Sequence, residues 1–141
     1  MKILFYDTKS YDREFFEKLL PSYPGIEIKF IEANIHEETA ALAHGYDAIC
    51  AFVNADLGAP VIEELHRQGV KLILMRCAGY NNVDLETTAK CGIQVARVPG
   101  YSPEAVAEHA MALALTANRH THKAYIKCRE NNFALNGLMG V

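Results

Sequence analysis

The sequence lacks the features that would point to a membrane, to secretion or to nucleic acid. Its 141 residues include 14 basic and 17 acidic side chains, with no block of like charge to attract nucleic acid or an anionic membrane surface. The most apolar stretch, residues 105–117, is interrupted by Glu108 and His109 and is too short to span a bilayer. The first twelve residues have too short an apolar run for a secretory signal. We therefore expect a cytoplasmic protein without a membrane or nucleic-acid partner.

Patterns that bind metals and nucleotides are also missing. The four cysteines have no C-x-x-C spacing, which favours reduced thiols: Cys50, Cys77, Cys91 and Cys128. An H-x-H pair, His120 and His122, would splay apart on a helix, and we expect no metal site. Neither G-x-G-x-x-G nor G-x-x-x-x-G-K occurs, so the chain has no nucleotide phosphate loop.

What the sequence does contain is an alternation of short apolar runs with helical patterns, which is typical of a parallel sheet with helices on its faces. The predicted strands are residues 2–7, 26–32, 48–53, 71–76 and 93–98. The runs around Ile49 and Leu72 are apolar on both faces, as central strands require, whereas the second run alternates and predicts an edge strand. The predicted fold is α/β, a flavodoxin-like doubly wound parallel sheet.

Helices are predicted between these strands by apolar spacing and by residues typical of helix ends. The predicted segments are residues 10–20, 60–69 and 83–92. In the last of them, Asp84 is the expected N-cap and Gly92 the expected residue after the C-terminus.

The final third of the chain has a different character. Ser102 and Pro103 predict the start of a long alanine-rich helix, with Tyr101 and Val106 at the two positions of a hydrophobic staple. This helix is apolar on most sides, so a single sheet face would not cover it. We therefore divide the chain into a domain at residues 1–100 and a segment of helices and tail at residues 101–141, which lacks a covering partner.

Two turns are candidate ligand sites, because open α/β sheets bind ligands at the carboxyl ends of their strands. The turn from Cys77 to Tyr80 offers the backbone amides of Ala78 and Gly79, which could hold an anion or merely connect a strand to a helix. The second turn leads into the helix from Ser102, and there Tyr101 serves either as a staple residue or as a ligand-binding hydroxyl.

Two further residues could take part in catalysis, but we regard a catalytic role as the weaker interpretation for both. Cys77 follows Arg76, a cation that could activate the thiol, but most free cysteines are buried and behave as small hydrophobic residues. His109 lies beside Glu108, and neighbours in sequence do not face each other on a helix. We expect a structural role for both.

The stretches "RCAGYNNVDLETTAKCG" and "VPGYSPEAVAEHAMAL" resemble the NAD-dependent D-2-hydroxyacid dehydrogenases, within which the D-lactate dehydrogenase branch is the most similar. The resemblance covers essentially the whole chain. It implies the N-terminal segment of the flavodoxin-like substrate domain, followed by helices that cross to an NAD-binding Rossmann domain absent from these 141 residues. The catalytic arginine, glutamate and histidine of the family are expected beyond Val141, so none is assigned here.

The resemblance also implies roles for residues of this chain. The amides of Ala78 and Gly79 match the turn that holds the substrate carboxylate, and Phe52 and Tyr101 match aromatic positions that line the substrate pocket. Val106 matches a position near the nicotinamide. Phe52 stands where some members carry tyrosine, so the preferred 2-oxo acid stays open.

The expected function is hydride transfer between NAD and a small D-2-hydroxy acid, with D-lactate and pyruvate as the expected pair. We expect the 141-residue chain to be inactive by itself and the complete enzyme to be a homo-oligomer, a dimer. The helix from Ser102 is a candidate surface for self-association. The alternative is a stand-alone flavodoxin-like module that binds an anion or regulates, without dehydrogenase activity.

Overall fold

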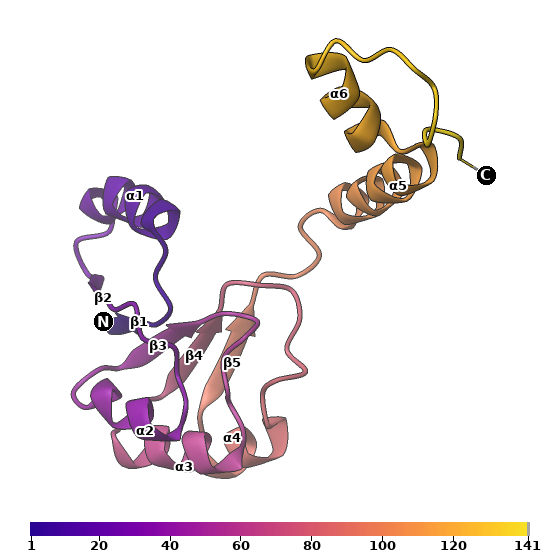
Figure 1. The fold of residues 1–141 in the computed structure, drawn as a ribbon. Helices are drawn as coiled ribbons and strands as arrows, with labels where there is room; N and C mark the ends of the chain where they lie inside the picture. Colours follow the sequence, from indigo (N-terminus) through magenta and orange to yellow (C-terminus); the bar gives the residue numbers. More distant parts are fainter. Residues whose placement is uncertain (141) are drawn as a thin grey trace. The chain divides into compact units, whose positions relative to one another are not determined.

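The computed structural model describes residues 1–140 and divides into two units, Met1–Pro99 and Gly100–Val141. The first unit is built on a five-stranded parallel sheet with the strand order β2-β1-β3-β4-β5 (Figure 1). Its strands are β1 (Lys2–Phe5), β2 (Glu27–Phe30), β3 (Ala48–Ala51), β4 (Leu72–Met75) and β5 (Gln94–Arg97). This is the flavodoxin-like order, so the predicted fold, all five strands and the edge position of the second are confirmed.

Helices connect the strands as the sequence predicts, with one addition. The helices of the first unit are α1 (Ser10–Leu19), α2 (Glu37–Ala40), α3 (Ala59–Arg67) and α4 (Leu85–Cys91). Short 3₁₀ turns follow α1 and α2, at Leu20–Ser22 and Ala41–Ala43. The four-residue helix α2 was not predicted, because a single turn is too short to show a helical period.

The register of the sheet brings the carboxyl ends of its strands to one edge. Phe5 pairs with Cys50, Ala51 pairs with Met75, and Met75 pairs with Arg97. The residues that directly follow β1, β3, β4 and β5 therefore lie along the same side of the sheet, where ligands of open α/β folds bind.

Helices cover the two faces of the sheet unequally. Figure 1 shows α2, α3 and α4 on one face and α1 on the other. The larger core lies on the three-helix side, where Ile49, Ile62 and Ile73 are fully buried. On the other side Phe5 packs edge-on against Phe16 of α1, with ring centroids 5.0 Å apart.

The Leu72 strand, β4, lies inside the sheet between β3 and β5, as its apolar residues predict, but only one of its faces is fully buried. Leu72 and Leu74 are only half-buried, whereas Ile73 and Met75, on the opposite face, are buried. The reason is that α1 is the one helix of the first unit on that face, so it does not shield β4 completely.

Both ends of α4 form as predicted from the sequence. The Asp84 carboxylate accepts a hydrogen bond of 2.9 Å from the Thr87 N–H, and this bond lowers the pKa of Asp84. Gly92 adopts a left-handed conformation with φ of 67°, which a residue without Cβ reaches at no steric cost. The Asp84 cap fixes where the chain passes from the turn after β4 into α4, and Gly92 ends α4 before β5.

The second unit contains α5 (Pro103–Arg119) and α6 (Thr121–Arg129). Ser102 is the N-cap residue, but its side chain makes no capping hydrogen bond. The two residues at the predicted staple positions are largely exposed, Tyr101 at 72% and Val106 at 69%. No side chain of α5 is buried. Among the residues described, no helix combines the length and hydropathy required to cross a membrane.

Replacing Ile49 by alanine should lower the free energy of unfolding of the chain by about 2–5 kcal/mol, because it leaves a cavity under the three-helix face. Urea denaturation followed by circular dichroism measures this loss. Leu42→Ala is the control, since Leu42 is 54% exposed and its truncation should cost less than about 0.5 kcal/mol. Equal losses in the two variants would contradict the assignment of the core.

Candidate functional site

The turn after β4 leaves the sheet at its carboxyl edge and is tied to the neighbouring strands. The Arg76 N–H donates to the Ala51 carbonyl at 3.0 Å, and the Val98 N–H donates to the Cys77 carbonyl at 3.2 Å. The Cys77 thiol then donates to the carbonyl of Gly79 at 3.2 Å. These bonds fix the chain on both sides of Ala78.

The amides of Ala78 and Gly79 remain available to a ligand. Among residues 1–140, none accepts a hydrogen bond from either N–H group. Gly79 is exposed, and no atom lies within 4 Å of the position that a Cβ would occupy. Two adjacent free donors on a tethered turn are chemically able to bind an anion such as a carboxylate.

Arg97, the last residue of β5, holds this turn from the side. Its Nη1 donates to the Ala78 carbonyl at 2.9 Å, and its guanidinium lies 5.0 Å from the centre of the Tyr80 ring. The contact orients the peptide group whose N–H belongs to Gly79. It also places a positive charge beside the two free amides, which favours an anionic ligand.

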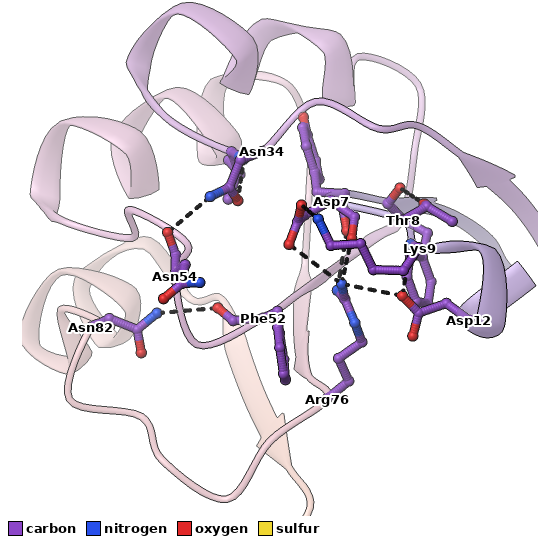
Figure 2. A network of polar contacts seen from close by, with 12 residues as sticks. Asp7, Thr8, Lys9, Asp12, Asn34, Phe52, Asn54, Arg76 and Asn82 are labelled. Carbon is purple, nitrogen blue, oxygen red and sulfur yellow. Dashed lines mark hydrogen bonds and ion pairs between the residues drawn. The ribbon is translucent and has the colours of Figure 1, made fainter. Parts of the chain in front are cut away.

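Arg76 lies at the centre of a buried polar network that joins β1 to β4 (Figure 2). Its guanidinium donates to the Tyr6 carbonyl at 3.1 Å and to the Asp7 carbonyl at 2.7 Å. The same group forms ion pairs with carboxylate oxygens of Asp12 at 3.6 Å and Asp7 at 3.9 Å. The Arg76 side chain is only 13% exposed. Its positive charge and its N–H donors are therefore compensated by these protein groups and little by water.

Asp7 takes an unusual backbone conformation to make these contacts. Its φ is 50°, in the left-handed region that aspartate enters more readily than most residues. Its N–H donates to the Ala33 carbonyl at 2.8 Å, while its carboxylate accepts from Lys9 Nζ at 2.6 Å, a bond that raises the pKa of Lys9. The network thus balances Arg76 and Lys9 against Asp7 and Asp12.

Phe52 directly follows β3 and lies beside Arg76, as Figure 2 shows. The guanidinium of Arg76 is 4.8 Å from the centre of the Phe52 ring. The Phe52 carbonyl accepts from the Ala55 N–H at 3.0 Å and faces the Asn82 amide at 3.5 Å. Asn82 also donates to the Ala55 carbonyl at 2.9 Å, which links the loop after β3 to the turn after β4.

The two cysteines near the network are buried and protonated. Burial raises the pKa of the Cys50 thiol to about 11, although the nearby Arg76 guanidinium acts in the opposite direction. Burial also raises the pKa of Cys77, again against the effect of Arg76. The proximity of a cation therefore does not activate Cys77, in agreement with the interpretation of this residue as a small hydrophobic one.

The structure brings together three of the five residues singled out from the sequence. Phe52, Ala78 and Gly79 lie on the carboxyl edge of the first unit. Tyr101 and Val106 belong to the second unit, and their approach to the turn stays a prediction.

Sequence reasoning missed the polar residues that support the site, above all Asp7, Asp12, Asn82 and Arg97. A signal for some of them was present, because Asp7 follows one apolar strand and Arg76 follows another. Opposite charges at the carboxyl ends of two parallel strands of one sheet are expected to lie close together.

Alkylation by iodoacetamide at neutral pH should modify Cys128 first, because it is exposed, and Cys50 and Cys77 much more slowly. Peptide mass spectrometry of the native chain over time gives the three rates. The Cys50 rate should rise as pH approaches its pKa of about 11. Modification of Cys77 as fast as Cys128 at neutral pH would show an activated thiolate instead.

Comparison with known proteins places this edge in context. Residues 3–134 match the family model of the D-isomer specific 2-hydroxyacid dehydrogenase catalytic domain. The chain is 48% identical over 140 residues to the D-lactate dehydrogenase of Escherichia coli, covering 99% of this chain and 42% of that protein. A curated relative in Curvularia clavata, a D-lactate dehydrogenase, is 49% identical over 143 residues and is covered to 41%.

Solved structures give the same result. The apo-structure of the Escherichia coli D-lactate dehydrogenase superposes with a TM-score of 0.85, covering 100% of this chain and 44% of that one. The pyruvate reductase of Chlamydomonas reinhardtii superposes with a TM-score of 0.84 at 44% identity, covering 100% of this chain and 41% of the other. The chain thus spans less than half the length of the proteins it matches. It belongs to the family of D-isomer specific 2-hydroxyacid dehydrogenases.

Proposed function

We propose that this chain forms the substrate-binding wall of an enzyme that transfers hydride between NAD and a small D-2-hydroxy acid, with D-lactate and pyruvate as the substrate pair. The free amides of Ala78 and Gly79 are the observation that carries this proposal. They would donate hydrogen bonds to the carboxylate that every 2-hydroxy acid and 2-oxo acid possesses. A rigid backbone site orients this carboxylate without ordering a flexible side chain, which lowers the entropic cost of binding.

Phe52 supplies the apolar part of the proposed pocket. It follows β3 on the same sheet edge as the turn and is half-buried, so part of its ring is open to a ligand. An aromatic ring suits a small apolar group such as the methyl of pyruvate. The family resemblance adds Tyr101 to this proposal as a second aromatic residue of the pocket, and Val106 as a residue near the nicotinamide.

The residues of this chain do not fit a binding site for the dinucleotide phosphates. The sequence contains no G-x-G-x-x-G, and the turn after β4 has only one glycine, Gly79. When bound, NADH would supply the hydride for reduction of the 2-oxo acid, and its binding would depend on protein outside these 141 residues. This chain's own contribution is to bind and orient the substrate.

A hybrid protein provides the most direct test. Residues 1–141 would replace the segment that they match in the Escherichia coli D-lactate dehydrogenase, which supplies the remainder of the enzyme. We expect the hybrid to reduce pyruvate with NADH and to produce D-lactate, whereas the 141-residue chain alone should be inactive. A folded hybrid that binds 2-oxo acids without reducing them would favour the alternative of an anion-binding or regulatory module.

In this hybrid, Gly79→Pro should raise the KM for pyruvate about 10- to 100-fold, because proline removes one N–H that binds a charged carboxylate. The maximal rate should fall less, since the bond is present in both the ground state and the transition state. Steady-state kinetics with NADH measures both constants.

Two variants control for effects of the substitution itself. Gly79→Ala keeps the N–H and meets no neighbouring atom within 4 Å, so it should change KM much less than the proline variant. Gly25→Pro introduces the same residue type at a turn before β2, away from the site, and should leave both constants unchanged. An unchanged KM in folded Gly79→Pro would contradict the amide site.

A further inference from the structure

Arg76 has the charge and the location of a substrate-carboxylate ligand, but its contacts are already complete. Both of its terminal nitrogens donate to backbone carbonyls just after β1, those of Tyr6 and Asp7. The carboxylates of Asp7 and Asp12 lie within 3.9 Å of Nη2. A substrate carboxylate would have to displace these partners from a side chain that is only 13% exposed, so direct binding is disfavoured.

The same guanidinium is in contact with two aromatic rings. Its central carbon is 4.6 Å from the centre of the Phe5 ring and 4.8 Å from that of Phe52. Phe5 is fully buried in β1 and packs against Phe16, so it cannot shift. Phe52 is half-buried at the end of β3, and its ring position depends on what lies against it. Arg76 therefore connects a fixed core ring to a ring at the site.

We propose that Arg76 is a positioning residue for substrate selection: it fixes the Phe52 ring and so sets the space left for the side chain of the 2-oxo acid. This inference rests on the function proposed above, which takes Phe52 as the apolar wall of the pocket. Arg76 acts through Phe52 and does not touch the substrate. Four polar contacts with Tyr6, Asp7 and Asp12 hold the guanidinium of Arg76 in place, and the guanidinium holds the Phe52 ring.

The first test compares 2-oxo acids of different size in the hybrid protein. Arg76→Lys keeps the charge between Asp7 and Asp12 but loses the planar group that lies against the ring. The ratio of kcat/KM for pyruvate to kcat/KM for 2-oxoisocaproate should fall about 3- to 30-fold, because a freed ring admits the larger side chain. Arg13→Lys is the matched control. Arg13 is on α1, and its guanidinium lies 5.0 Å from the centre of the Phe30 ring of β2, so this variant should leave the substrate ratio unchanged.

A second comparison separates positioning from a general loss of structure. In a Phe52→Ala background there is no ring to hold, so Arg76→Lys should no longer change the substrate ratio. Phe5→Leu, which alters no charge, should shift the ratio in the same direction as Arg76→Lys. An equal effect of Arg76→Lys with and without the Phe52 ring, or no effect in either, would overturn the proposal.

A readout independent of activity distinguishes failure of this inference from failure of the proposed function. Fluorine NMR of the hybrid labelled with 4-fluorophenylalanine reports on the Phe52 ring, whose signal is assigned through Phe52→Leu. Arg76→Lys should shift or broaden that signal and Arg13→Lys should not. A hybrid that reduces no 2-oxo acid refutes the proposed function, whereas an unchanged Phe52 signal in Arg76→Lys refutes the role of Arg76.

Discussion

The buried guanidinium of Arg76 is the constraint on which the carboxyl edge of the sheet depends. Arg76 follows β4, but its guanidinium donates to the carbonyls of Tyr6 and Asp7, which follow β1. The flat face of the guanidinium lies against the ring of Phe52, which follows β3. One side chain thus sets the relative positions of three strand ends. The cost of burying its charge is offset by two carboxylates, Asp7 and Asp12, and removing either partner would leave charge uncompensated. The turn with the free amides begins immediately after this fixed point.

This arrangement separates two tasks that one arginine could have combined. The neutral network around Arg76 gives rigidity, while the backbone amides of Ala78 and Gly79 stay free for an anion. Arg97 adds the positive charge near the turn and orients the peptide group between Ala78 and Gly79. In the proposed enzyme, the substrate would therefore meet backbone donors on a supported turn, and the mobile parts of the site would come from elsewhere.

The sequence predicted the features that depend on local pattern. The strands around Ile49 and Leu72 were recognisable because their residues are apolar without interruption, and the ends of α4 because Asp84 and Gly92 are typical of helix termini. The turn at Ala78 and Gly79 follows the end of a strand, as predicted, and its role as an anion site stays a prediction. By contrast, the staple spacing of Tyr101 and Val106 did not reveal that both side chains are largely exposed, because exposure depends on what packs against them.

The features that the sequence did not reveal are contacts between distant segments. Arg76 and Tyr6 are 70 positions apart, and Asn82 reaches a carbonyl 27 positions away at Ala55. Such pairs become visible only once the strand order places β3 beside β4, and β1 on the other side of β3. The resemblance to the family singled out Phe52, but the contact of its ring with Arg76 is one of these long-range contacts.

The central claim is that the substrate carboxylate is bound by the turn amides and not by Arg76. A crystal structure of the hybrid protein with NADH and the pyruvate analogue oxamate tests it directly. The account predicts carboxylate oxygens at about 2.7–3.2 Å from the nitrogens of Ala78 and Gly79, with the contacts of Arg76 to Asp7 and Asp12 intact. A carboxylate bound to the Arg76 guanidinium, with the two aspartates displaced, would contradict it.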